Sequence, residues 1–298
     1  MSLTKAIKIY VCPVVLAVGI IGNGLSFVVM TRKSLRGQVT SFYLALLAVF
    51  DTLALTVGIT SNWYHDGLEM SALSEATCKI VIFIDYWFTD AVNWIVSLIA
   101  LDRLVNIIFP QKAKTWITLK RSVWLSVSVI LFLFVINFQL LFIMRIQEKS
   151  YENKTYVGCG FTSVQAHTIF SWIDLACFCV IPFTVISSCN AAVIIRLYLV
   201  KSRSTEQRMT SITLKLILVS LIPLVCTTPF EVYQLSGRDI TEAEHLYAIS
   251  HLLIFVSNSI NFFVYCIVGE SFRNELRKLF CRNQVAAAPA DGLMDERV

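Results

Sequence analysis

Charged residues are scarce in this chain. Only 15% of its 298 residues are Asp, Glu, Lys or Arg, whereas 56% are hydrophobic, and the mean hydropathy is +0.70. Soluble domains carry about 25% charged residues. The composition therefore excludes a soluble globular protein, a disordered chain and a nucleic-acid-binding protein. Six prolines and eleven glycines are too few for a fibrous protein, so we expect a bundle of membrane spans.

Cysteine pairs at metal-binding or redox spacing are also missing. None of the nine cysteines forms a CxxC pair, which argues against zinc and thiol redox chemistry. The four histidines show no metal-ligand spacing, and no nucleophile motif is present. We therefore expect neither an enzyme nor a metal site.

The main feature of the sequence is a series of long apolar runs. Each of seven runs can cross about 30 Å of hydrocarbon as a helix, and backbone exposed to lipid must form its hydrogen bonds internally. The runs are too long and continuous for barrel strands. We predict an all-α membrane protein whose seven helices cover 8–31, 40–63, 77–108, 121–144, 165–199, 208–235 and 244–268.

The distribution of lysine and arginine predicts the orientation, because the cytoplasmic side of a membrane protein carries most of them. The loops after spans one, three, five and seven are the basic ones. The amino terminus is therefore expected outside and the carboxyl terminus in the cytoplasm. The basic residues include Arg32, Lys33, Arg36, Lys112, Lys114, Lys120, Arg121, Lys201, Arg203, Arg273, Arg277 and Lys278.

Two cysteines and a glycosylation sequon fall on the outer side. Asn153 begins an Asn-Lys-Thr sequon in an outer loop. Cys159 lies in the same loop, and Cys78 lies at the outer start of span three. Both thiols face an oxidising compartment, so we expect a disulfide that holds the loop over the bundle. The alternative is two unpaired thiols.

The chain resembles the rhodopsin-like family of G-protein-coupled receptors over residues 8–281. The motifs of that family occur in order along the spans, with 25 residues between Cys78 and Arg103. They are Gly22-Asn23, Leu47-Ala48-Val49-Phe50-Asp51, Asp102-Arg103-Leu104, Trp124, Pro182, Cys226-Thr227-Thr228-Pro229 and Asn261-Phe262-Phe263-Val264-Tyr265.

The resemblance assigns roles to several buried polar residues. Asp51 lies in mid-span, where a charge is costly and usually functional. The family brings Asn23 and Asn261 beside this acid, often around a sodium ion, and a protonated structural Asp51 is the alternative. The family also uses Arg103 as a switch that binds Asp102 at rest and the G protein when active. Pro229, Asn261 and Tyr265 belong to the same activation machinery.

A short amphipathic helix is expected at 270–281, with its apolar face in the inner interface of the membrane. Cys281 at its end resembles the palmitoylation site of the family, and a plain cytosolic thiol is the alternative. We expect one receptor domain over 1–281, with a short extracellular segment 1–7, and a disordered cytoplasmic tail over 282–298.

Some family positions carry unusual residues. Thr227 replaces a tryptophan, Asn190 replaces a tyrosine and Phe262 replaces a proline. Span six contains two prolines, each of which removes a helix hydrogen bond, so we expect this span to be bent. The ending at 258–266 resembles FMRFamide-type neuropeptide receptors.

Acidic residues in the outer halves of three spans predict the ligand. Asp85 lies five helical turns, about 27 Å, from Arg103. Asp174 precedes Pro182 by two turns, and Glu231 follows Pro229 closely. Asp90 is expected beside the cavity rather than in it. The predicted ligand-binding residues are Asp85, Tyr86, Asp174, Phe230, Glu231, His251 and Phe255.

Converging acids imply a cationic ligand, unless they are protonated or pair internally with His251 or Arg145. We predict a receptor for a short basic neuropeptide that activates heterotrimeric G proteins at the plasma membrane. The alternatives are a receptor for an amine or a small chemosensory cation, and a cation-coupled transporter. Residues 244–268 contain no lysine for a retinal Schiff base, which excludes an opsin. No cofactor is expected apart from the sodium ion.

Overall fold

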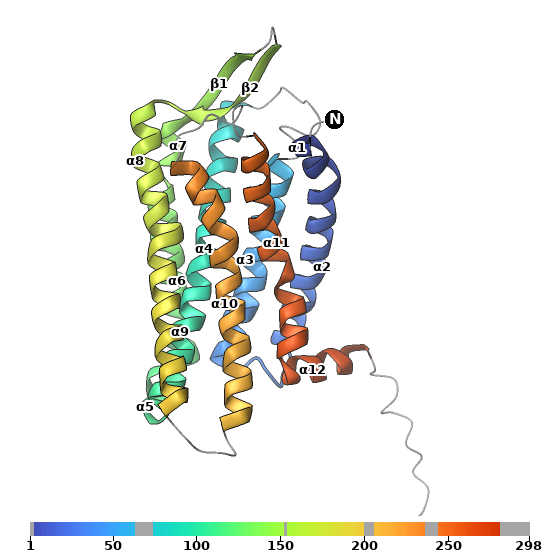
Figure 1. The fold of residues 1–298 in the computed structure, drawn as a ribbon, viewed down its shortest axis with the longest axis vertical. Coiled ribbons are helices and arrows are strands. Elements are labelled where there is room, and N and C mark those ends of the chain that lie inside the picture. Colours follow the sequence, from blue (N-terminus) through green and yellow to red (C-terminus); the bar gives the residue numbers. More distant parts are fainter. Residues whose placement is uncertain (1–2, 63–73, 152–153, 200–205, 236–243, 281–298) are drawn as a thin grey trace, which may run out of the picture.

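The computed structural model is a bundle of long helices standing side by side (Figure 1). A β-hairpin covers one end, here called the hairpin end, and helix α12 lies across the other, the α12 end. The structure describes residues 3–62, 74–151, 154–199, 206–235 and 244–280. Its elements are α1 (Leu3–Ala6), η1 (Ile7–Val11), α2 (Cys12–Met30), α3 (Val39–Asn62), α4 (Glu75–Ile108), α5 (Pro110–Trp116), α6 (Leu119–Asn137), α7 (Leu140–Ile143), β1 (Met144–Tyr151), β2 (Lys154–Phe161), α8 (Val164–Asp174), η3 (Leu175–Val180), α9 (Ile181–Leu199), α10 (Glu206–Leu235), α11 (Glu244–Val268) and α12 (Glu270–Phe280).

The helices agree with the spans expected from the sequence. Within the described residues, six helical segments are long and apolar enough to cross a membrane. Helix α10, with 30 residues, is the remaining long helix of the bundle. The expected span 165–199 is not one uniform helix, because the π-helix η3 separates α8 from α9.

Helix α4 is the central element of the bundle. It contacts α3, α6, α9 and α10, and its residues 95–100 are buried on every side. A helix that is apolar all round belongs in the interior of a bundle. By contrast, α6 exposes Trp124 and Val135 on its outer face, as a helix facing lipid should.

Local side-chain signals set the start of several helices. The hydroxyl groups of Ser74, Thr118 and Ser163 accept hydrogen bonds from backbone N–H groups in the first turns of α4, α6 and α8. Ser and Thr are favoured at this position because the first N–H groups of a helix have no backbone partner. The same sequence features therefore fix where these spans begin.

The loop between the fourth and fifth spans forms the antiparallel hairpin of β1 and β2, which we had not expected as strands. Cys159 in β2 pairs with Ile146 in β1. Met144 at the start of β1 packs with Phe83 and Phe170. The hairpin is thus anchored on the apolar surface of the bundle.

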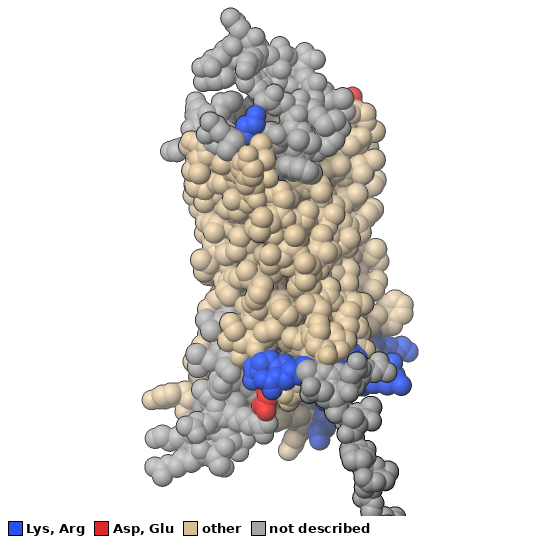
Figure 2. Space-filling model, turned by 90° about the vertical axis from the view of Figure 1, so that its right-hand side faces the viewer, with Lys and Arg blue, Asp and Glu red and all other residues tan. Residues whose placement is uncertain are grey.

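The short amphipathic helix is confirmed as α12, and Cys281 lies outside the described residues. Phe272 is buried and packs against Tyr265, with ring centroids 5.8 Å apart. Arg273 donates hydrogen bonds to the Cys266 and Ile267 carbonyls, at 3.1 and 3.0 Å, at the end of α11. Figure 2 shows a broad band of uncharged residues above a group of Lys and Arg at the α12 end.

Glu275 ties α12 to the loop after α2. Its carboxylate accepts hydrogen bonds from Lys278 Nζ at 2.7 Å and from Arg32 Nε at 3.0 Å. The Lys278 hydrogen bond, together with a Ser34 bond and the charges of Lys278 and Arg32, holds the pKa of Glu275 below its usual value of 4.5. The carboxylate therefore stabilises the docked helix at neutral pH.

We predict that Glu275→Gln loosens α12 because the ion pair with Arg32 is lost. Hydrogen–deuterium exchange at the amides of 270–280 should be faster, because the docked helix loses about 1 kcal/mol of stabilisation. A carboxyl with a lowered pKa stabilises the fold above its unfolded pKa, and this contribution disappears as the pH falls through the folded pKa. The wild-type protection should therefore fall below about pH 4.5, whereas that of Glu275→Gln should not. Glu270→Gln, at an exposed site, is the control. Equal exchange in all three proteins would contradict this role.

Candidate functional site

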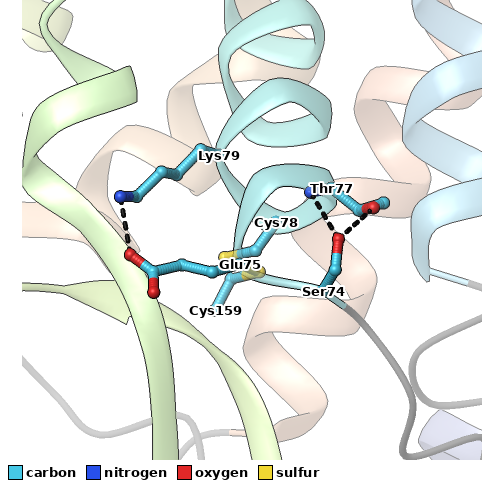
Figure 3. The surroundings of a disulfide bond; sticks show 6 residues. All are labelled: Ser74, Glu75, Thr77, Cys78, Lys79 and Cys159. Carbon is cyan, nitrogen blue, oxygen red and sulfur yellow. Dashed lines mark hydrogen bonds and ion pairs between the residues drawn. A yellow bond between two sulfur atoms is a disulfide. The ribbon is translucent and has the colours of Figure 1, made fainter.

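The hairpin end is held together by the disulfide between Cys78 and Cys159, which is confirmed. Its Cα atoms are 5.8 Å apart and 81 residues apart in the sequence. Figure 3 shows the bridge joining the first turn of α4 to β2, beside the Glu75–Lys79 ion pair. Losing a disulfide typically costs about 2–5 kcal/mol in soluble domains. The bridge keeps the hairpin on the hairpin end of α4.

Asp85 lies against α3 at a glycine. A Cβ atom added to Gly58 would lie 2.9 Å from Asp85 Oδ1 and 2.8 Å from the Phe255 ring. Only glycine permits this close approach, so Gly58 lets the carboxyl of α4 and the ring of α11 meet at one point of α3. From the sequence we did not identify Gly58, because its role depends on two distant residues.

Aromatic rings extend this site towards α10. The His251 ring lies 4.6 Å from the Phe230 ring, 4.4 Å from the Tyr247 ring and 5.9 Å from the Phe255 ring, measured between centroids. Among the described residues, His251 Nε2 has no hydrogen-bond partner. The predicted residues Phe230, His251 and Phe255 therefore form one row of rings, and its Phe255 end lies near Asp85 at Gly58.

Tyr86 occupies another side of α4. Its hydroxyl accepts a hydrogen bond of 3.0 Å from Gln234 Nε2, and its ring packs edge-to-face on Phe170. Gln234 was missed from the sequence. Its signal is the spacing of three residues from Glu231, which places both side chains on one face of α10.

Asp174 and Glu231 lie together, but their third partner is Asp90 rather than Asp85. The Asp174 carboxyl interacts electrostatically with Asp90 and Glu231, and Glu231 interacts with Asp90. The position of Asp90 beside the ligand cavity stays a prediction. Its buried carboxyl accepts a 2.6 Å hydrogen bond from Asn137 of α6, which packs on α4.

The π-helix η3 follows from Pro182. Proline has no N–H, so carbonyls one turn before it lose their donor. Asn93 Nδ2 donates to the Phe178 carbonyl at 3.1 Å, and Trp94 Nε1 donates to the Cys177 carbonyl at 2.8 Å. Two neighbouring side chains of α4 thus replace the missing backbone donors. This pairing fixes η3 directly after Asp174.

Asp51, Asn261 and Asn23 lie in the middle of the bundle. Asn261 Nδ2 donates a 2.8 Å hydrogen bond to Asp51 Oδ2, and Asn23 Nδ2 donates to the Asn258 carbonyl at 3.0 Å. In the described part of the chain, Asp51 Oδ1 and Asn23 Oδ1 accept no hydrogen bond. These two buried oxygens are suitable ligands for a water or a sodium ion, and that site stays a prediction.

The residues of the predicted switch gather towards the α12 end. Asp102 accepts a 2.8 Å hydrogen bond from the Thr40 hydroxyl. The buried Arg103 interacts electrostatically with Asp102 and Tyr265. Thr40 was not identified from the sequence. The structure therefore joins α3, α4 and α11 at this point.

Pro229 lies inside α10, which continues as one helix through both of its prolines. The hydroxyls of Thr227 and Thr228 donate to the Leu224 carbonyl at 3.3 and 2.7 Å. Such bonds are commonly found where a helix bends. Two predicted modification sites, Asn153 and Cys281, lie outside the described residues.

These elements form a bundle of seven long helices with buried polar residues at two levels. The family model described as 7 transmembrane receptor (rhodopsin family) matches residues 22–265. The chain therefore belongs to the rhodopsin family of seven-transmembrane receptors, a family of signalling proteins that are not enzymes. The match confirms the family resemblance, whereas the FMRFamide-type subfamily stays a prediction.

We predict that Asn93→Leu destabilises the receptor by about 1 kcal/mol, because the Phe178 carbonyl loses its donor inside the bundle. Thermal unfolding of the purified protein measures the loss. Ser97→Ala is the matched control, because the buried Ser97 hydroxyl bonds only to the Asn93 carbonyl of its own helix. Identical midpoints for the two variants would show that Asn93 does not support η3.

Proposed function

We propose that this receptor binds an extracellular cationic ligand, in first place a short basic neuropeptide of the FMRFamide-receptor type, and activates heterotrimeric G proteins. Membership of the rhodopsin family supports the receptor activity, and it favours a receptor over the transporter alternative. The ligand class rests on one observation, the position of Asp85.

The Asp85 carboxyl and the Phe255 ring both lie against Gly58 in the hairpin half of the bundle, and the His251 ring follows Phe255 and contacts Phe230. A carboxylate binds a guanidinium through two parallel hydrogen bonds, and aromatic faces attract cations. An arginine side chain combines both requirements, since it is planar, permanently charged and stacks on rings.

A receptor for an amine or another small cation is the second candidate. A cavity of about 10 Å³ lies between Lys8, Tyr247, His251 and Phe255. That volume holds about one water molecule, so the amine alternative rests on Asp85, whose single carboxylate can bind one ammonium group. A screen of amidated basic peptides against amines, with G-protein activation as the readout, separates the two candidates.

The orientation is part of the proposal. Lys and Arg gather at the α12 end (Figure 2), which we propose to be cytoplasmic in the plasma membrane. The hairpin end is then extracellular, with Asn153 available for glycosylation. Cys281 at the end of α12 is then placed at the inner leaflet for palmitoylation.

We predict that Asp85→Asn weakens binding of an arginine-containing peptide about 30-fold or more, because the buried cation loses its counter-charge. The wild-type receptor should show a similar loss when citrulline replaces arginine, since citrulline has nearly the same shape without the charge. Glu75→Gln, at an exposed acid paired with Lys79, is the control. Equal affinity of the wild type for both peptides would overturn the cationic site.

We also predict that Arg103→Ala abolishes nucleotide exchange on the G protein while the same peptide still binds. Arg103 lies about 27 Å along α4 from Asp85, too far to touch the ligand. Nucleotide exchange and peptide binding are measured on the same membranes, with the exposed Arg36→Ala as control. Undiminished exchange in Arg103→Ala would show that the family role does not apply here.

A further inference from the structure

The short helix α5 carries an exposed face of two aromatic rings and one lysine. It lies at the α12 end of the bundle, between α4 and α6 in the chain (Figure 1). Phe109, directly before it, and Trp116, at its end, are 44% and 50% exposed, and Ala113 is the only buried residue of the helix. A helix of seven residues is too short to cross a membrane. It therefore lies on the surface of the bundle.

A lysine lies between the two rings. Lys112 Nζ is 5.9 Å from the centroid of the Phe109 ring and 5.2 Å from that of the Trp116 ring, and the two ring centroids are 6.0 Å apart. Residues spaced by three, four and seven positions share one face of a helix. We call Phe109, Lys112 and Trp116 the aromatic face of α5. Its rings attract the ammonium group through their negative π-faces.

The segment that carries the aromatic face is basic throughout. Residues 109–121 contain four cations and no acidic residue. The cations are Lys112, Lys114, Lys120 and Arg121. In the described part of the chain, none of these four side chains forms an ion pair with a carboxylate. The positive charge of this segment is therefore available to an anionic partner.

Both ends of α5 are hydrogen-bonded to the neighbouring spans. The Phe109 N–H donates a 2.9 Å hydrogen bond to the Val105 carbonyl in α4. Arg121 Nη1 in α6 donates a 2.7 Å hydrogen bond to the Thr115 carbonyl. Because both ends are held, α5 presents its aromatic face in a fixed position at the α12 end.

The apolar surface of the aromatic face continues along the chain into α6. Leu119, Val123 and Trp124 in the first turns of α6 are exposed, as expected of residues that face lipid. Aromatic rings favour the interface between hydrocarbon and water. A lysine beside them buries its carbon stem and keeps its ammonium group at the level of the head groups. Rings, a lysine and an excess of positive charge together match an anionic membrane surface.

We propose that α5 is a second membrane anchor of this receptor. Its aromatic face lies in the inner membrane interface, and its basic residues bind the head groups of anionic phospholipids. Helix α12 contacts α2 and α11, whereas α5 contacts α4, so the two anchors support different helices. The contact holds the end of α4 that carries Asp102 and Arg103 at a constant depth. Of the proposed function, the inference uses the orientation alone, and it holds for any ligand.

Hydrogen–deuterium exchange of the full-length receptor in lipid nanodiscs tests the anchor without ligand or G protein. Discs of phosphatidylcholine are compared with discs that also contain phosphatidylserine. The amides of 109–116 should exchange about fivefold more slowly in the anionic discs, as expected for one lysine beside an anionic surface. The amides of β1, at the other end of the bundle, should exchange equally in both.

Variants separate the roles of the charge and the ring. Lys112→Gln should remove most of the difference between the two kinds of disc, and Trp116→Ala should speed exchange in both. Trp116→Phe should keep most of the protection. Gln111→Ala is the control, because Gln111 is exposed on α5 but lies off the aromatic face. A role of Lys112 confined to contacts within α5 would slow exchange equally in both kinds of disc.

Quenching by brominated lipids measures the depth of the ring. The fluorescence that Trp116→Phe removes should be quenched more by lipids brominated near the head group than by lipids brominated near the chain end. Equal exchange in both kinds of disc, with no quenching of this fluorescence, would show that α5 lies in water and would overturn the anchor. Protection of 109–116 that requires an added G protein, whatever the lipid, would show a protein-binding surface instead. Neither result affects the proposed ligand site at Asp85.

Discussion

The need to satisfy buried polar groups inside the bundle controls this structure. Backbone carbonyls in a membrane-spanning helix cannot turn to water, so each group freed by a proline requires a donor from a neighbouring helix. Asn93 and Trp94 meet that need beside Pro182. They hold η3 against α4 and thereby set the position of Asp174. The position of the Asp174 carboxyl thus depends on two hydrogen bonds in which no acidic side chain takes part.

Helix α4 carries functional residues at both levels of the bundle. Asp85 and Asp90 lie in its hairpin half, and Asp102 and Arg103 lie near its other end. Residues 95–100, which lie between them, are buried on every side, and the helix packs against α3, α6 and α9. The disulfide at Cys78 fixes its hairpin end. Such a helix is a rigid reference, against which α10 and α11 present Glu231 and His251.

The residues at which this chain departs from its family make specific contacts with their neighbours. Phe262 stands where a proline is usual, and a Cβ atom on Gly22 would approach the Phe262 Cβ to 3.0 Å. Its ring also packs on Phe272 of α12. Thr227, in place of the usual tryptophan, turns its hydroxyl to the backbone of its own helix. These contacts link the unusual residues to the docking of α12 and to the course of α10.

The sequence alone determined the spans, the disulfide and the family, because hydrophobic length and motif spacing can be read along the chain without coordinates. It also placed Asp51 with Asn261 through the family resemblance, and Phe230 with His251 through their positions in the outer halves of two spans. It could not determine which neighbouring helix meets each acid. The rotation of α4 separated Asp90 from Asp85, and only the packing of α6 gave Asp90 its hydrogen bond from Asn137. Contacts of this kind depend on how several helices are turned about their axes, and that is decided by the tertiary structure as a whole.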